Sequence, residues 1–513
     1  MVYTILDAYT DEPAGLGVPP YLGTYPRYIF GALKKEGHEV YYLTIDDLRL
    51  WHSKKKMPDK SREMITNKKL YNITKNPADT AKILEKTKVL VVNIGMQTPG
   101  TYLSAVPGTL QELTPMIKPL RCKKVLTGPA AQHGTQLIGG RTAEKLDGSL
   151  FDHVEVNFLN INNFKVMEDY VPYSAEIIEQ IPYPVIIEIE TGKGCYRSPG
   201  CSFCTEPLKN RIQYRDQEPI IKEIKAFYDK GCRYFRYGKQ TDFYSYKFSK
   251  PEEIEKLLKG SWEVCPGIEV LHIDNCDPRI VVSRNGEAIT KLIVQYCTPG
   301  NVAAFGVETF DPAVIKANTL NCEEGMALKA TQIVNKYGAE RGANGMPKFL
   351  PGINLLFGLK GETKETNEYN IRGLKEIYDA GLVIRRINIR QVTIFPGTAM
   401  EEVGTKFIKK NKRMYWNWRN MVRQEIDVPM LKRVVPSGTI LKNVMAEVYD
   451  GNTTFGRQIG TYPLAIGMVG RLPLGKFFDV KVTKHMLRSV TGEPILEKTM
   501  LNISYIQSPG HLS

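Results

Sequence analysis

Hydrophobic runs alternate with amphipathic segments along the first 150 residues of the chain. VYTILDAY, HEVYYLTI and KVLVVNIG have the composition of buried strands, and YPRYIFGALKKEG has helical spacing and ends at Gly37, a suitable helix terminator. Strands that alternate with helices predict a parallel sheet covered on both faces. Because ligands of such sheets bind at the carboxyl ends of the strands, the loops that follow these strands are candidate binding segments.

The same alternation recurs more regularly between residues 180 and 400. Strand-like segments are separated there by helical ones such as PIIKEIKAFYDKG and ETNEYNIRGLKEIYDAG. The expected strands are 185–190, 234–238, 268–274, 302–308, 352–358 and 387–395. Six βα units predict an α/β fold of the partial, open (β/α)6 barrel type, in which the chemistry gathers at the C-terminal ends of the strands.

The pattern changes after residue 400. Residues 401–435 are basic and aromatic, which is typical of an amphipathic connecting helix and also of an arm that contacts a substrate. From residue 436 to residue 513, period-two runs separated by glycine turns predict a small antiparallel β-barrel of about five strands.

Composition narrows the class of protein. A chain of 513 residues is too long for one core, so two to four domains are expected. No apolar run approaches the roughly 20 residues of a membrane span, and the N-terminus lacks the basic region of a secretory signal. We therefore expect a cytoplasmic protein that does not act at a membrane. The net charge of +14 favours anionic partners such as RNA or an acidic protein face, although composition alone slightly favours the simpler explanation that many of these charges are solvated lysines.

Three of the nine cysteines gather in one short stretch, GCYRSPGCSFCTEP, which contains Cys195, Cys201 and Cys204. This loop comes directly after the first strand expected in the barrel, so it lies at the catalytic face. Thiolates bind soft metals and iron–sulfur clusters, and four of them would indicate structural zinc. Three thiolates on a cubane cluster leave one iron open to a small molecule, so we predict that these cysteines are metal ligands in a catalytic site. A three-thiolate zinc site and a fortuitous cysteine-rich loop are the alternatives.

The cysteine loop and the six βα units resemble the radical S-adenosylmethionine (SAM) superfamily. The usual spacing of that family has three residues between the first two cysteines and two between the last two, whereas this chain has five and then two. The resemblance implies a 4Fe-4S cluster held by the three cysteines, SAM on the open iron, and a 5′-deoxyadenosyl radical that abstracts hydrogen from a substrate. It also implies SAM contacts from the aromatic residue in the loop, from the segment after the second strand, and from the ends of the fourth and fifth strands. These candidates are Phe203, Gly238, Lys239, Gln240, Glu308 and Gly358.

An α/β domain ahead of such a barrel resembles the Rossmann-like cobalamin-binding domain of class B radical SAM methyltransferases. We expect it over residues 1–165, with Gly95, Gly128 and Pro129 as candidate cobalamin contacts. The Asp-x-His-x-x-Gly motif of many cobalamin proteins is missing, and His133 lies in a suitable loop without the Asp. The resemblance therefore implies cobalamin whose cobalt has no protein histidine below it.

The segment 436–513 is similar to a TRAM-like barrel, which occurs on RNA-modifying enzymes. Taken together, the parts resemble an archaeal group of radical SAM proteins of largely unassigned function. Among cobalamin-dependent relatives, one known task is C-methylation of a glutamine in methyl-coenzyme M reductase. The first hypothesis is thus a cobalamin-dependent enzyme that methylates an sp3 carbon of a macromolecule, either a protein side chain or RNA, with an external electron donor. The second is a radical SAM enzyme that modifies tRNA, although residues 1–180 contain only Cys122 and so lack the second cluster of methylthiotransferases. The third is a non-catalytic iron–sulfur protein that binds RNA.

Overall fold

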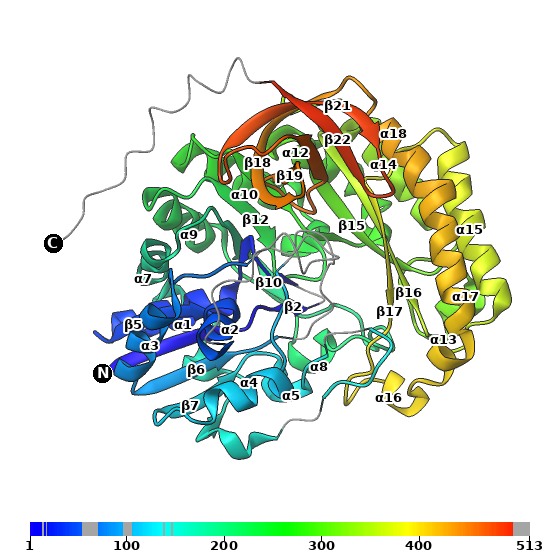
Figure 1. Cartoon of the computed structure of the whole chain (residues 1–513). Coiled ribbons are helices and arrows are strands. Elements are labelled where there is room, and N and C mark those ends of the chain that lie inside the picture. The colour runs from blue at the N-terminus through cyan, green and yellow to red at the C-terminus, as the bar shows by residue number, and fades with distance from the viewer. Residues whose placement is uncertain are drawn as a thin grey trace.

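A computed structural model describes residues 1–12, 15–16, 18–53, 70–95, 105–136, 139–144 and 147–495. Parallel sheets and helices form packed units that are arranged in a ring (Figure 1). This arrangement confirms the predicted α/β class. Within the described ranges, no helix is both long enough and apolar enough to cross a membrane.

The first unit is a parallel sheet with strand order β5-β1-β6-β7-β8. Its strands are β1 (Val2–Asp7), β5 (Glu39–Thr44), β6 (Val89–Asn93), β7 (Lys123–Thr127) and β8 (His153–Val154). Alternate residues point to opposite faces, so Ile5 packs in one core with helix α1 (Thr24–Lys35), whereas Leu6 packs in another with α3 (Pro77–Lys86) and α4 (Leu110–Ile117). The sheet is therefore covered on both faces, as the pattern predicted.

The second unit is a parallel half-barrel made of two short sheets. One sheet contains β9 (Ile186–Glu190), β12 (Tyr234–Gly238) and β13 (Val270–Ile273), and the other contains β14 (Asn275–Cys276), β15 (Asn301–Glu308), β16 (Phe349–Phe357) and β17 (Arg386–Gln391). The outer helices are α9 (Gln217–Asp229), α10 (Pro251–Val264), α12 (Gly286–Tyr296), α14 (Met326–Gly338) and α15 (Lys364–Asp379). All six expected strands are present, and each observed strand overlaps its predicted range.

The N-terminal part of the chain contacts both open edges of this half-barrel. Strand β4 (Tyr21–Leu22) pairs in parallel with β9, although it lies within the range expected for a separate first domain. At the other edge, the amide of Ala143 donates to the carbonyl of Ile394 over 2.9 Å, and that of Gly140 donates to Val392 over the same distance. The last predicted strand ends earlier than expected, at Gln391. The amide of Val392 still donates to Phe357 of β16 over 2.7 Å, and the chain around Val392 and Ile394 pairs with the N-terminal segment.

The predicted linker folds as helix α17 (Lys406–Val422), a π-helical turn (Arg423–Asp427) and helix α18 (Val428–Val434). Its aromatic residues are largely structural, since Trp418 and Tyr415 pack on Phe357 at ring-centroid distances of 4.7 Å and 5.3 Å. Its lysines lie on the solvent side of α17.

Five strands then form a closed barrel, β18 (Ile440–Asp450), β19 (Thr453–Gln458), β20 (Ala465–Val469), β21 (Phe477–His485) and β22 (Ser489–Ile495). It is not purely antiparallel as expected. Strand β22 runs antiparallel to β21 and in the same direction as β20. It therefore pairs with β20 in parallel.

Candidate active site

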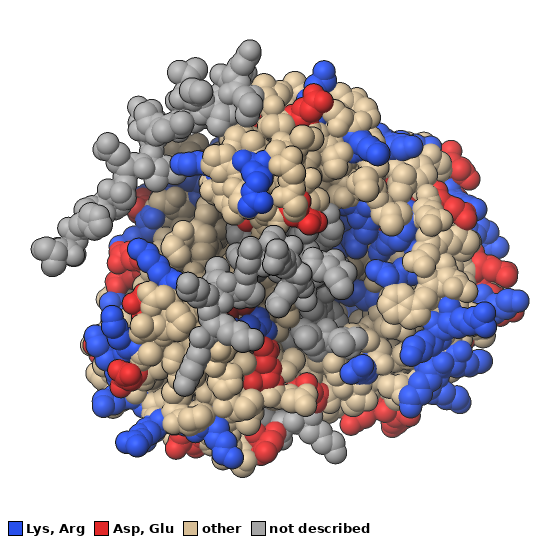
Figure 2. Space-filling model, in the orientation of Figure 1, with Lys and Arg blue, Asp and Glu red and all other residues tan. Residues whose placement is uncertain are grey.

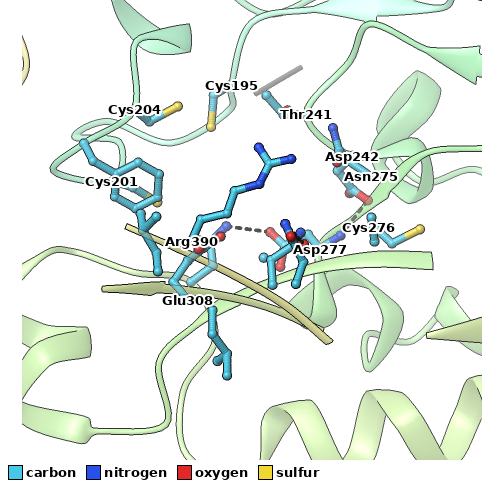
Figure 3. Close-up of a pocket in the computed structure, with 18 of the residues that line it drawn as sticks. Cys195, Cys201, Cys204, Thr241, Asp242, Asn275, Cys276, Asp277, Glu308 and Arg390 are labelled. Carbon is cyan, nitrogen blue, oxygen red and sulfur yellow. Dashed lines mark hydrogen bonds between the residues drawn. The ribbon is translucent and has the colours of Figure 1, made fainter. Parts of the chain in front are cut away.

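The three clustered cysteines lie on the loop that leaves the carboxyl end of β9. Two short strands, β10 (Gly192–Lys193) and β11 (Gln213–Tyr214), pair at the base of this loop, and the cysteines lie between them in the chain. Gly194 follows β10 with φ +81°, and a Cβ there would lie 2.3 Å from the carbonyl of Arg211, so this position requires glycine. Cys195, Cys201 and Cys204 then line the same side of one pocket (Figure 3).

Each of these thiols accepts a hydrogen bond from the loop itself. The amide of Arg197 donates to Cys195 over 3.5 Å, its guanidinium donates to Cys201 over 3.1 Å, and the amide of Glu206 donates to Cys204 over 3.4 Å. Burial raises the pKa of both Cys201 and Cys204 to about 12, so a metal must displace their protons. The three donors favour the thiolate form that a metal would bind.

Three cysteines are the thiol ligands available on this side of the pocket. Among the described residues, no three His, Cys, Asp or Glu side chains converge as the ligands of one metal ion do. A cubane cluster takes each thiolate on a different iron, so its ligands stand apart. Cys276 also lines the pocket, but it lies on the opposite side, with its sulfur turned away from the other three (Figure 3).

The pocket has a volume of about 310 Å³ and opens at the carboxyl ends of the half-barrel strands. Its walls come from the cysteine loop, from the strand ends on the far side and from the C-terminal barrel. Figure 3 shows the Arg390 side chain between the cysteines on one side and Asp242, Asn275 and Asp277 on the other. The C-terminal barrel contributes Tyr462, whose hydroxyl donates to Asp274 over 2.9 Å.

Two of the predicted SAM contacts, Phe203 and Glu308, line this pocket. Phe203, like Cys201, packs against a small apolar cluster. Glu308 ends β15 with φ +64°, a conformation that is rare for a residue with a side chain and is typical of functional strand ends. Burial raises the pKa of Glu308 to about 8, although nearby Arg390 opposes this shift.

In the segment after the second barrel strand, the residues that line the pocket come further along the chain than predicted. Gly238 lies against the carboxylate of Glu188, and the Lys239 ammonium lies 4.7 Å from the ring centre of Tyr25, so neither lines the pocket. Gln240 is also buried outside it. The next two residues, Thr241 and Asp242, line the pocket in their place. The sequence pattern identified the segment, but the turn decides which of its residues face inward.

Gly358 lies outside the pocket as well. It has φ +93°, and a Cβ there would lie 2.3 Å from a side-chain carbon of Ile408 in α17. Its amide donates over 2.8 Å to Glu362, which closes the turn after β16. The structure thus gives Gly358 a role in packing under α17.

The three candidate cobalamin contacts lie at the carboxyl edge of the N-terminal sheet. Gly95 follows β6, and Gly128 and Pro129 follow β7. A Cβ on Gly95 would lie 2.5 Å from Thr10, and one on Gly128 would lie 2.6 Å from Asn93, so both glycines allow close packing of the protein's own loops. Beyond β7, residues 139–144 run beside residues 392–394, and Val392 and Thr393 line the pocket. The edge where a cofactor of this domain would bind therefore adjoins the cysteine pocket.

Sequence reasoning missed a polar row on β17 that consists of Arg386, Asn388 and Arg390. All three line the pocket. A period-two signal was present in the segment RINIRQ, because its polar residues alternate with isoleucines. That pattern indicates a strand with a polar inner face, which in a half-barrel is the face that lines the cavity.

Two archaeal proteins are similar to the chain over nearly its whole length. A protein of Methanocaldococcus jannaschii, described as uncharacterized, is 42% identical over 97% of this chain and 94% of its own length. A second uncharacterized protein, from Archaeoglobus fulgidus, is 39% identical over 96% of this chain and 89% of its own length. No protein-family model matches the chain.

Two solved enzymes have a distant likeness in shape. TsrM of Kitasatospora setae, a radical SAM methyltransferase with cobalamin and a 4Fe-4S cluster bound, is 14% identical with a TM-score of 0.45 over 78% of this chain and 76% of its own. OxsB, a cobalamin-dependent SAM radical enzyme, is 12% identical with a TM-score of 0.47 over 80% of this chain and 61% of its own. The cofactors named for these enzymes are the three that the sequence resemblance implies. Likenesses this distant carry no functional assignment, which depends on the residues of the site.

Proposed function

We propose that this chain, which belongs to one family with the M. jannaschii and A. fulgidus proteins, is a radical SAM enzyme. The observation that carries the proposal is the loop after β9, whose three thiols line one side of a pocket at the carboxyl ends of parallel strands. Chemistry in parallel barrels gathers at these strand ends. Three cysteine ligands leave one iron of a cubane cluster for SAM.

The residues around the pocket have distinct roles in this proposal. Arg197 and the amide of Glu206 hold the thiolates by hydrogen bonds, and Phe203 covers the cluster loop on its apolar side. One carboxyl oxygen of Asp242 accepts a hydrogen bond from the backbone amide of Asp277 over 2.9 Å. The other oxygen is buried and has no hydrogen-bond partner in the described part of the chain. Asp242 would bind the amino group of SAM through that second oxygen, and Glu308 would bind its ribose. When bound, the cluster and SAM supply the radical chemistry.

The finer proposal is methylation of an sp3 carbon in a macromolecule, with cobalamin as the methyl carrier. The contact between residues 139–144 and residues 392–394 supports it, because the carboxyl edge of the N-terminal sheet then adjoins the cysteine pocket. The sequence resemblance suggests a protein side chain as the substrate, such as the glutamine of methyl-coenzyme M reductase, and an external electron donor.

Replacing one cluster cysteine tests the radical SAM assignment. Cys201→Ala in the full chain, purified without oxygen, should lose the broad visible absorption of the cluster and produce no 5′-deoxyadenosine from SAM after reduction. The physical reason is that two thiolates no longer hold the cubane.

Cys122→Ala is the matched control, because Cys122 has a similar partial exposure but lies beside the N-terminal sheet. It should keep both the absorption and the SAM cleavage. If Cys201→Ala still produced 5′-deoxyadenosine at the wild-type rate, the ligand assignment and the proposed activity would both be wrong. A corrinoid spectrum that stays with the protein through gel filtration would support the finer proposal independently.

Modification of tRNA is the second candidate function, and one surface feature favours it. Helix α17 exposes Lys406, Lys409, Lys410, Lys412 and Arg413, and Figure 2 shows a Lys and Arg patch on this side of the molecule. Such a patch would bind phosphates in a salt-dependent way. Tight tRNA binding that weakens steeply with salt, together with no bound corrinoid, would favour this second function over the first.

A further inference from the structure

The inner face of β17 presents a row of three hydrogen-bonding side chains to the pocket. Arg386, Asn388 and Arg390 are alternate residues of one strand, so they point to the same side. Asn388 lies opposite Asn354 of β16. The side-chain NH2 group of Asn388 donates to the side-chain oxygen of Asn354 over 3.1 Å. This pair forms the middle of the row and lies between the two guanidinium groups.

Small residues on the neighbouring strands leave space beside Arg386. Gly352 of β16 lies opposite Arg386, and a Cβ on this glycine would lie 3.0 Å from a carbon of the arginine side chain. The next strand, β15, places Ala304 beside Gly352 and Gly306 beside Asn354. Ala304 and Gly306 line the pocket, so the space that these two small residues leave is part of it.

No acid forms an ion pair with Arg386 in the described part of the chain, although Asp427 lies near enough for the charge of Arg386 to oppose the rise in its pKa that burial causes. Among the described residues, the Arg386 guanidinium has neither a hydrogen bond nor an ion pair, and it stacks 4.0 Å from the ring centre of Tyr462. Burial lowers the pKa of Arg386, and the nearby charges of Arg390 and Arg423 lower it further. Asp274, the nearest pocket acid to Tyr462, is already bound by Arg236 over 3.0 Å. Figure 2 shows Lys and Arg side chains gathered next to the C-terminal barrel.

We propose that Arg386, with Asn388 and Asn354, binds an oxyanion of the substrate, either a carboxylate or a phosphate. The stacking on Tyr462 fixes the plane of the guanidinium, so its N–H groups are free to form two parallel hydrogen bonds with two oxygens. The amides of the asparagines supply further donors. This inference rests on the proposed function, because it assigns a chemical class to the substrate of the same pocket. It also makes the C-terminal barrel part of the substrate site through Tyr462.

Binding of two simple probes to the full chain tests the proposal. Succinate and inorganic phosphate are titrated separately into the protein and followed by calorimetry, and the stronger probe identifies the class of oxyanion. Arg386→Gln should lower the binding affinity for that probe by at least about tenfold, since it removes a charged, two-point contact. Arg386→Lys keeps the charge without the planar fork and should recover part of the affinity, and Asn388→Ala should weaken the probe by a smaller factor.

Arg372→Gln is the matched control, because Arg372 also stacks on a tyrosine, at 4.6 Å from Tyr369, but lies exposed on α15. It should bind the probes as the wild type does. Melting temperatures of all variants separate a loss of binding from a loss of structure. The proposal is overturned if the wild type binds neither probe saturably, if Arg386→Gln binds them unchanged, or if SAM displaces the probe competitively. SAM cleavage in the same samples reports on the proposed function separately, because that reaction depends on the cysteines.

Discussion

At the residue scale, the site depends on positions where the backbone has an unusual conformation or a very close neighbour. Gly194 lets the cysteine loop pass over Arg211, and Glu308 holds a left-handed conformation at the edge of the pocket. A residue with a side chain in that conformation costs free energy, which the surrounding structure must offset. Such positions therefore indicate where packing and function constrain the chain together.

Gly358 offers a clean test of close packing at this scale. Gly358→Ala should lower the free energy of unfolding by more than the roughly 1–2 kcal/mol of a left-handed alanine, because its Cβ would also collide with Ile408. Gly231→Ala is the control, since its φ of +91° is nearly the same but no atom lies within 4 Å of the added carbon. Urea denaturation of both variants measures the difference. Equal losses would show that the contact with α17 is not tight.

At the scale of elements, the loop between β19 and β20 joins the C-terminal barrel to the half-barrel. The amide of Thr461 donates to Nδ1 of the buried His272 over 2.9 Å, and the hydroxyl of Tyr21 donates to the carbonyl of Gly460 over 3.3 Å. Tyr462, next in the chain, is the residue that lines the pocket. The barrel is thus attached at the same loop that completes the site.

The lowered pKa of His272 predicts that the stabilisation from this attachment is lost at acidic pH. Burial lowers the pKa of His272 from 6.5 to about 4, so the folded state binds fewer protons than the unfolded state. Stability is therefore present above pH 6.5 and is lost as the pH falls toward 4. The gap of about 2.5 between the two values corresponds to a loss on the order of 3 kcal/mol.

Urea midpoints at pH 7 and at about pH 4.5 measure this loss. His272→Asn keeps an acceptor for Thr461 but cannot become charged, so its midpoint should change less with pH than that of the wild type. His153→Asn, at an exposed position, should follow the wild type. A His272→Asn midpoint that falls as steeply as the wild type would contradict the assignment.

At the scale of the whole molecule, one buried ionic cluster connects the N-terminal part to the half-barrel. Arg27 of α1 and Arg215 both pair with Glu223 of α9, over 2.5 Å and 2.7 Å, and all three side chains are fully buried. One core also runs through Ile5, Ile187 and Val444, which belong to the first sheet, the half-barrel and the C-terminal barrel. We therefore expect the three parts to unfold together.

Glu223→Gln should destabilise the whole molecule by about 3–5 kcal/mol, because it leaves two buried guanidinium groups without their anion. Burial alone would raise the pKa of Glu223, but Arg215 and Arg27 reverse this and hold it below its usual value. The stabilisation is therefore present near neutral pH and is lost as the pH falls through that lowered pKa.

Calorimetry of Glu223→Gln should show a single transition at a lower temperature. Glu218→Gln is the control on the same helix, since the exposed pair of Glu218 with Lys222 should contribute nothing measurable. Two separate transitions in the wild type would contradict the single cooperative unit.

The sequence by itself determined the features that depend on local order. Alternating apolar segments gave the six half-barrel strands their positions, because period and length are properties of each segment alone. The spacing of Cys195, Cys201 and Cys204 placed three thiols on one loop, and the position of that loop after a strand placed it at the functional edge.

Only the tertiary structure decided which side chains meet. Thr241 and Asp242, and not Gly238 to Gln240, reach the pocket, because the turn after β12 sets the direction of each side chain. Tyr462 reaches it from a loop that lies 188 positions after Asp274, to which it is bonded. The parallel pairing of β20 with β22 and the closure of the half-barrel by β4 are likewise long-range contacts. Local pattern carries no information on such contacts, since they depend on how distant segments pack together.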